Sequence, residues 1–130
     1  MIFCEGCCYK NINTPPPPHH YWFVLSDPDL NDQKIIVANV TEWDDWNGDG
    51  ACRLGAGDHR FLYKPSYINY ADAKMVTLVI LDGIDKLCHV KAYEPASKEL
   101  LVRMQQGVLD SEFCANRFKI LLNNQGLPDV

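Results

Sequence analysis

Long hydrophobic runs are missing from this sequence. No stretch approaches the roughly 18 consecutive apolar residues that a membrane-spanning helix needs. The first residues also lack the basic start, the apolar stretch and the small-residue cleavage site of a secretory signal. We therefore expect a cytoplasmic protein that does not associate with membranes.

Several common catalytic motifs are absent as well. The sequence contains no glycine-rich phosphate loop, no dinucleotide-binding fingerprint, no nucleophile elbow and no zinc-protease helix motif. The enzyme classes that depend on these motifs are therefore unsupported, and we expect no cofactor.

Basic residues are outnumbered by acidic ones. The 12 Lys and Arg residues against 17 Asp and Glu residues give a formal net charge of −5, so the molecule as a whole repels a phosphate backbone. Any contact with nucleic acid would have to be local. Four cations fall within one short stretch and permit a basic groove there: Arg53, Arg60, Lys64 and Lys74.

The six cysteines are expected to be reduced structural thiols, because disulfides are rare in a reducing compartment. Cys4, Cys7 and Cys8 include the spacing of a zinc knuckle, and His19 and His20 could complete a set of four ligands. However, four prolines separate the two groups, and the overall spacing does not match a zinc-finger pattern. We therefore expect no metal site.

Residues 42–50 (EWDDWNGDG) form the most loop-like stretch of the chain. Asp45, Asn47, Asp49 and Gly50 loosely match the ligand and turn positions of a calcium loop, but the flanking helices and the terminal bidentate Glu of an EF-hand are missing. The Asn-Gly and Asp-Gly turn signals favour a solvated hairpin tip instead.

The length of 130 residues and the ordinary composition predict one domain with one core. Residues 1–18 have no clear period and end in four prolines, so we expect an extended lead-in, followed by the domain at residues 19–130. Two apolar runs, 21–26 (YWFVLS) and 34–41 (KIIVANVT), predict an antiparallel strand pair. The latter half of residues 71–81 is also strand-like.

Two helices are predicted near the C-terminal end. Residues 96–106 follow Pro95 and show apolar residues at helical spacing, with Gly107 as the expected end. Residues 111–123 show the same spacing. Short strands followed by two helices predict an α+β fold, in which the helices cover one side or end of the sheet.

Two polar residues flank the predicted strand pair. His20 precedes the first strand and Thr41 closes the second, so an antiparallel pairing puts both at the same rim of the sheet. An imidazole there can transfer a proton near neutral pH, and a hydroxyl can bind a phosphate oxygen. A strand-flanking polar residue and a β-forming threonine would explain the same positions.

Other candidate residues also have two open interpretations. His59 lies in a glycine turn, where we expect an exposed imidazole. Lys74 precedes an apolar run, and a lysine at such a position is commonly only solvated. Tyr63, Tyr67 and Tyr70 could stack on bases, although packing against the helices explains them equally well.

Three segments together resemble the PemK/MazF group of toxin endoribonucleases: residues 21–28 (YWFVLSDP), 34–42 (KIIVANVTE) and 57–81 (GDHRFLYKPSYINYADAKMVTLVIL). In that group a first core strand ends in a Ser-Asp type turn, and a second apolar strand ends near a catalytic Thr or Ser. The resemblance covers roughly residues 19–85. It implies a small SH3-like antiparallel β-barrel with two C-terminal helices, usually a homodimer, with an antitoxin-like protein as partner.

The resemblance also implies metal-independent cleavage of single-stranded RNA, in which the ribose 2′-hydroxyl attacks the adjacent phosphorus. Thr41 matches the hydroxyl position of the group. Where the group carries an arginine before its first core strand, this chain has His20, which would serve as general acid or base. His59 and Lys74 would be electrostatic partners. The residues expected to contact RNA or a partner are Arg53, Arg60, Lys64, Tyr67, Tyr70 and Trp43.

The alternative interpretation is a non-catalytic barrel that binds a protein or peptide. It depends on an aromatic surface formed by Trp43, Trp46, Tyr67 and Tyr70. Loss of binding on substitution of these aromatic residues, with His20 dispensable, would distinguish this interpretation from the nuclease.

Overall fold

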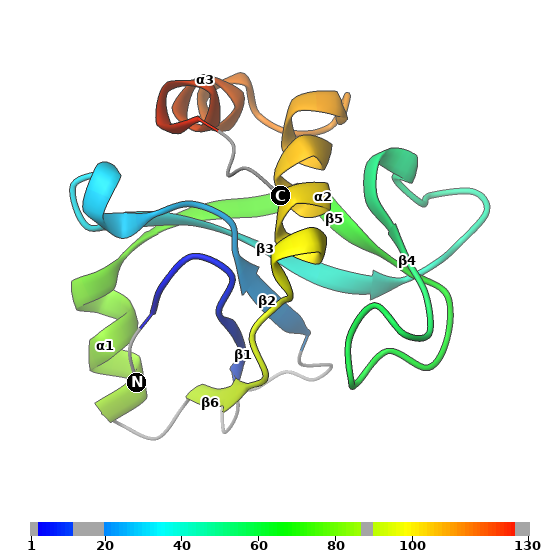
Figure 1. Cartoon of the computed structure of the whole chain (residues 1–130), viewed down its shortest axis with the longest axis horizontal. Helices are drawn as coiled ribbons and strands as arrows, with labels where there is room; N and C mark the ends of the chain where they lie inside the picture. Colours follow the sequence, from blue (N-terminus) through cyan, green and yellow to red (C-terminus); the bar gives the residue numbers. More distant parts are fainter. Residues whose placement is uncertain (1–2, 12–19, 87–89, 127–130) are drawn as a thin grey trace.

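A computed structural model describes residues 3–11, 20–86 and 90–126 of the chain. In this part of the chain, one antiparallel sheet of six strands, ordered β4-β5-β3-β2-β1-β6, curls into a half-barrel (Figure 1). The strands are β1 (Cys8–Asn11), β2 (Tyr21–Val24), β3 (Lys34–Glu42), β4 (Arg53–Leu54), β5 (Ser66–Thr77) and β6 (Val90–Tyr93). The helices are α1 (Leu78–Lys86), α2 (Lys98–Asp110) and α3 (Asn116–Gln125). The predicted α+β class is confirmed.

The predicted strand pair forms the centre of the sheet. β2 and β3 pair antiparallel, with Trp22 opposite Asn39 and Val24 opposite Val37. β3 is flanked by β2 and β5, so its apolar run is buried from Ile35 onward. A run of β-branched residues suits such a central strand because both faces of the sheet are covered there.

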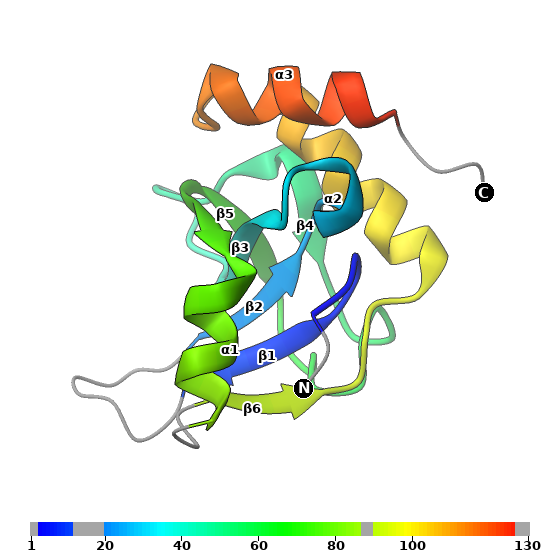
Figure 2. The ribbon, with the colours of Figure 1, turned by 90° about the vertical axis from the view of Figure 1, so that its left-hand side faces the viewer.

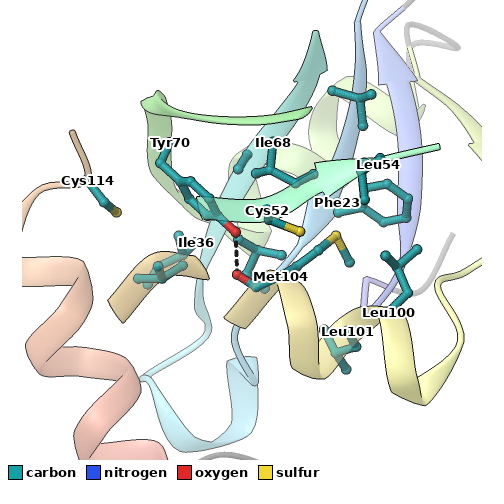
Figure 3. Packing of buried hydrophobic residues seen from close by; sticks show 14 of the residues in the cluster. Phe23, Ile36, Cys52, Leu54, Ile68, Tyr70, Leu100, Leu101, Met104 and Cys114 are labelled. Atoms are coloured by element: carbon teal, nitrogen blue, oxygen red, sulfur yellow. Dashed lines mark hydrogen bonds between the residues drawn. The ribbon is translucent and has the colours of Figure 1, made fainter. Parts of the chain in front are cut away.

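Side chains of the central strands alternate between two faces of the sheet. On one face, Phe23 and Ile36 pack with residues of α2 and α3, and we call this the α2 face (Figure 3). On the other face, Val24 and Ile35 pack with Leu81 of α1, and we call this the α1 face. Figure 2 shows α1 and α2 on different sides of the strands.

α2 begins close to its predicted start but extends beyond its predicted end. The Ser97 hydroxyl caps the helix by accepting a hydrogen bond from the backbone N–H of Leu100 at 3.1 Å. The helix continues past Gly107, so the expected termination there is wrong. A Cβ at Gly107 would lie 2.0 Å from the Tyr70 hydroxyl, so this glycine allows the helix to approach β5 closely.

α3 confirms the second predicted helix, with a later start at Asn116. Ser111, expected inside this helix, lies in the connection after α2. Its hydroxyl is buried and donates to Asp49 Oδ2 at 2.6 Å. The connection is thereby attached to the loop that precedes β4.

The strand expected in the latter half of residues 71–81 ends earlier, and α1 follows it. β5 pairs with β3 as far as Thr77, which lies opposite Lys34, the first residue of β3. Beyond that point β5 has no partner on β3, and the backbone turns into a helix that buries Leu81 and exposes Val79. A short apolar run does not distinguish a strand from a helix by its periodicity, which is why the sequence pattern failed here.

The N-terminal segment is not simply a lead-in. β1 pairs with β2, with Tyr9 opposite Trp22, and also with β6, with Cys8 opposite Tyr93. Cys8 and Tyr9 are buried on opposite faces of the sheet. The expected boundary between a lead-in at 1–18 and a domain at 19–130 is therefore corrected: β1 belongs to the sheet. The four prolines lie outside the described residues.

None of the helices in the described ranges is both long and apolar enough to cross a lipid bilayer.

Candidate functional site

Three side chains form a row across three neighbouring strands, and His20 lies just before the first residue of a fourth strand, β2. Thr41 lies opposite Tyr67, and Tyr67 lies opposite Arg53. Extending the β2–β3 register by two residues puts His20 opposite Thr41. Neighbouring strands are about 4.8 Å apart, so consecutive members of this row are close together. We call His20, Thr41, Tyr67 and Arg53 the polar row.

The polar row lies on the α1 face of the sheet. The residues that alternate with it along the strands, Val40, Leu54 and Ile68, all belong to the core on the α2 face. Alternation along a strand therefore directs the polar row to the other side. Extension of the β2–β3 register by two residues would direct His20 to this face as well, beside Thr41.

The imidazole of His20 is held by the backbone of β3. Its Nδ1 lies 3.1 Å from the carbonyl oxygen of Val40. Because a carbonyl oxygen only accepts hydrogen bonds, Nδ1 carries the proton and donates it. In the neutral ring Nε2 is then unprotonated, so this contact makes Nε2 the proton acceptor of His20.

The hydroxyl of Thr41 is oriented by a buried amide. Thr41 Oγ1 donates to Asn39 Oδ1 at 2.8 Å, and Asn39 is only 2% exposed. The hydroxyl oxygen keeps lone pairs that can accept a further hydrogen bond. Rotation of the hydroxyl away from Asn39 would let it donate to a ligand instead.

An aromatic ring positions the cation at the end of the polar row. The guanidinium carbon of Arg53 lies 3.7 Å from the ring centroid of Trp43. Trp43 in turn meets the Tyr67 ring edge-on, with the centroids 5.6 Å apart. Stacking of this kind holds a guanidinium in place without neutralising its charge.

Lys74 lies on the same face as the polar row, two rows further along the strands. It is opposite Val37 on β3, and its Nζ stands 5.0 Å from the ring centroid of Trp22. A small hollow of about 110 Å³ lies at these residues. Lys74 is exposed, so its charge is available to a ligand on the α1 face.

Arg53 and Lys74, unlike three other cations of the described chain, have no carboxylate partner there. Arg60 pairs with Glu94 (3.5 Å), Lys64 with Glu42 (3.1 Å) and Arg103 with Asp58 (2.7 Å). Arg53 and Lys74 stand over tryptophan rings instead. An anion approaching the α1 face therefore meets two cations that no described acidic side chain neutralises.

His59 does not belong to this site. The ring is 9% exposed, so the expectation of an exposed imidazole is wrong. It packs against Phe61, with ring centroids 4.3 Å apart, and against Phe23 of the α2-face core. Its Nε2 lies 2.5 Å from the carbonyl oxygen of Glu94. A cavity of about 570 Å³ lies beside it, away from the polar row.

The four cations expected in one groove are divided between two sides of the sheet. Lys64 lies at a hollow lined by Tyr21 and Ser66 on the α2 side, and Arg60 lies beside His59. Of the four, Lys74 lies on the α1 face, and alternation directs Arg53 there too, although Arg53 also borders a hollow beside α2. The prediction of a single basic groove containing all four cations is therefore wrong. Two of the four, Arg53 and Lys74, lie near the polar row.

The three tyrosines do not form one stacking surface, because Tyr63 is 80% exposed whereas the other two are buried. Tyr70 is 1% exposed and donates its hydroxyl proton to the Met104 carbonyl oxygen at 2.6 Å (Figure 3). Tyr67 is 5% exposed. The aromatic surface expected for peptide binding is not formed as predicted either, because both of its tyrosines are buried. Of its four members, Trp46 is 94% exposed and Trp43 is half-buried.

The loop that loosely matches a calcium site uses its carboxylate for structure. Asp49 is 7% exposed and accepts hydrogen bonds from the Ala51 N–H at 3.0 Å and the Ser111 hydroxyl at 2.6 Å. The solvated hairpin tip expected for this loop is therefore found at the exposed Trp46, whereas Asp49 is buried. No three metal-ligating side chains gather within the described ranges, and His19 lies outside them.

Two residues of this face were missed by sequence reasoning. Asn39 appears in the sequence only as one amide within the apolar run KIIVANVT, and Trp22 as a core aromatic residue. A single polar residue inside a buried strand is the signal that could have identified Asn39, because a buried amide requires a hydrogen-bond partner. Nothing in the sequence indicates the contact between Trp22 and Lys74.

Comparison of the sequence with models of protein families and with curated proteins gave no match.

Proposed function

We propose that the polar row binds single-stranded RNA and cleaves its backbone without a metal ion, as do the PemK/MazF endoribonucleases that the sequence resembles. The row itself supports this most directly, because the extended β2–β3 register would put an imidazole beside a hydroxyl and a guanidinium that share one face of the sheet. Phosphodiester cleavage needs a proton acceptor and a cation for the charge that develops at phosphorus.

In the proposed reaction, His20 acts as the general base. Its Nε2 takes the proton of a ribose 2′-hydroxyl, and the 2′-oxygen then attacks the adjacent phosphorus. The bond to the 5′-oxygen of the next nucleotide breaks, this oxygen takes a proton from water, and the RNA is left with a 2′,3′-cyclic phosphate. The contact between Nδ1 and the Val40 carbonyl favours this role, because it fixes the tautomer in which Nε2 is free to accept.

The other members of the site bind phosphate groups. Arg53 stabilises the negative charge on the non-bridging oxygens of the reacting phosphate, and the Thr41 hydroxyl turns from Asn39 to donate to one of them. Lys74 binds a neighbouring phosphate of the same strand. This local pair of cations would offset the repulsion expected from the net charge of −5.

The proposal includes the remaining features of the family. These are an SH3-like barrel, a homodimer, a cytoplasmic location and an antitoxin-like protein as partner. The curled antiparallel sheet of the described residues is compatible with such a barrel. Analytical ultracentrifugation at several concentrations tests the dimer, and a monomer at all of them would contradict it.

The experiment is an RNA cleavage assay with matched variants. The purified protein is incubated with a long single-stranded RNA in the presence of a metal chelator, and with the same sequence as DNA. We expect cleavage of RNA only, because DNA lacks the attacking 2′-hydroxyl. His20→Ala should lower the rate about 100-fold or more, the range for loss of a general acid or base. Arg53→Ala should have a similar effect.

Arg60→Ala is the matched control, because Arg60 is an exposed arginine on the other side of the sheet. It should cleave like the wild-type protein, and circular dichroism verifies that each variant is folded. No cleavage by the wild-type protein would reject the nuclease. Equal losses in Arg53→Ala and Arg60→Ala would reject the polar row as its location.

A further inference from the structure

Two cysteines are held together at the start of the sheet, in the turn Cys4-Glu5-Gly6-Cys7. The N–H of Cys7 donates to the carbonyl oxygen of Cys4 at 3.0 Å, which closes a four-residue β-turn. Gly6 has a φ of +88°, the conformation that a type II turn requires at its third residue. The Cα atoms at the ends of a β-turn are less than about 7 Å apart, and a disulfide requires a similar Cα separation.

The turn is fixed to the rest of the molecule. The N–H of Gly6 donates to the Val24 carbonyl at 2.8 Å, and the Gly6 carbonyl accepts from the Ala96 N–H at 2.8 Å. The Glu5 carboxylate accepts hydrogen bonds from Gln105 at 3.0 Å and Gln125 at 2.5 Å. The backbone that carries the two thiols is therefore positioned by β2 and by both C-terminal helices.

The two sulfur atoms lie in direct contact. Cys4 Sγ is 2.8 Å from Cys7 Sγ, and the Cys4 N–H donates to Cys7 Sγ at 3.1 Å. A disulfide bond length is about 2.05 Å, so less than about 1 Å of movement separates the thiols from a covalent bond. The hydrogen bond with Cys7 and partial burial raise the pKa of Cys4 to about 11, so Cys4 is a poor first nucleophile and the exchange starts at Cys7.

The neighbouring Cys8 is a different kind of thiol. It is 2% exposed in the α2-face core, and burial raises its pKa to about 12. A thiol of this kind is unreactive, because the thiolate is the attacking species. Cys4, by contrast, is exposed to solvent. This segment thus holds a pair of thiols, one exposed and one half-buried, and next to it an inert thiol as an internal control.

We propose that Cys4 and Cys7 form a reversible disulfide by exchange with a low-molecular-weight disulfide such as oxidised glutathione. The Cys7 thiolate attacks one glutathione sulfur, the glutathione S–S bond breaks, and one glutathione thiolate leaves and takes up the Cys4 proton. Cys4 then attacks Cys7 Sγ and expels the second glutathione. Two cysteine thiols are oxidised, and one glutathione disulfide is reduced to two thiols.

This site is separate from the polar row. The turn contacts the Val24 end of β2, whereas His20 precedes the opposite end. The proposal therefore does not depend on the nuclease. Transient disulfides of this kind are the form that redox sensing takes in reducing compartments.

The experiment uses the full-length protein, first reduced and then incubated with oxidised glutathione. The protein is then unfolded with denaturant so that the buried Cys8 also reacts, remaining thiols are blocked with an alkylating agent, and the peptide containing residues 1–10 is examined by tandem mass spectrometry. We expect this peptide to lose two hydrogens, to carry one alkyl group on Cys8, and to yield no fragments from cleavage between residues 4 and 7. Dithiothreitol should restore alkylation at all three cysteines.

Two variants complete the test. Cys8→Ser should form the same bond, whereas Cys4→Ser should stop at a mixed disulfide with glutathione on Cys7. A wild-type peptide with all three cysteines alkylated, or with Cys8 in the bond, would overturn the proposal. Stoichiometric zinc that protects Cys4 and Cys7 from glutathione would also overturn it, by assigning the pair to metal binding.

Discussion

The Tyr70 hydroxyl of β5 donates to the Met104 carbonyl oxygen of α2 at 2.6 Å and occupies the space in which a side chain at Gly107 would lie. The two hydrogen-bonded residues are both buried: Tyr70 is 1% exposed and Met104 is 0% exposed. The packing of α2 against the sheet therefore depends on a glycine that sequence reasoning assigned to the end of a helix.

Substitution of this glycine should destabilise the fold. In Gly107→Ala, the new methyl group meets the Tyr70 side chain, and we expect a loss of about 1–3 kcal/mol in the free energy of unfolding. Gly83→Ala is the control, because Gly83 lies in α1 with open space around it. That change should stabilise the protein by about 0.5–1 kcal/mol through helix propensity. Urea unfolding measures both, and equal effects of the two substitutions would contradict the close packing at Gly107.

The hydrogen bonds of Asp49 should contribute to stability rather than to ion binding. Asp49→Ala removes the acceptor of the buried Ser111 hydroxyl and of the Ala51 N–H. We expect a loss of about 2–3 kcal/mol, since a buried donor left without a partner carries its full desolvation cost. Glu112→Ala, an exposed neighbour of Ser111, should stay within about 0.5 kcal/mol of the wild-type protein. A rise of the melting temperature with added calcium that Asp49→Ala abolishes would contradict this assignment.

The ion pair of Asp58 and Arg103 should make stability depend on pH. Partial burial acts to raise the pKa of Asp58, but the Gly55 N–H at 2.8 Å and the Arg103 guanidinium at 2.7 Å outweigh it and lower the pKa. The unfolded carboxyl has a pKa of about 3.9. The contribution of Asp58 is therefore fully present above that pH and is lost as the pH falls through the lower folded value.

The measurement compares the wild-type protein with Asp58→Asn by urea unfolding from neutral to acidic pH. The wild-type protein should be more stable at neutral pH, and the difference should shrink as the solution becomes acidic. In an Arg103→Gln background the pH-dependent difference should be smaller, because one of the two groups that lower the pKa is gone. A difference that grows on acidification would show the opposite sign of the pKa shift.

Lys74 should contribute to RNA binding through its charge alone. If it binds a phosphate, Lys74→Ala weakens binding about equally for different RNA sequences and reduces the slope of log affinity against log salt by about 1. Lys64→Ala is the matched control, because Lys64 is an exposed lysine paired with Glu42 away from the α1 face. Fluorescence anisotropy with a labelled single-stranded RNA at several salt concentrations gives both slopes. Unequal losses among RNA sequences for Lys74→Ala would indicate base contact instead.

Part of the candidate site could be predicted from local pattern. The apolar runs of β2 and β3 are separated by a short polar turn, and such runs pair antiparallel, so the ends that carry His20 and Thr41 meet at one rim. The partners of these side chains could not be predicted. Asn39 and the Val40 carbonyl are fixed by register, which depends on how the whole sheet packs.

Local sequence pattern was enough to place the central strand pair and the two C-terminal helices, because hydrophobic periodicity and capping act over a few neighbouring residues. Long-range packing is what joins β1 to the sheet, replaces a strand by α1 after Thr77 and separates the cations onto two sides. Each of these outcomes depends on which segments become neighbours, and that is set by burial of the whole core rather than by any local signal. The burial of Tyr70 and His59 follows from the same cause.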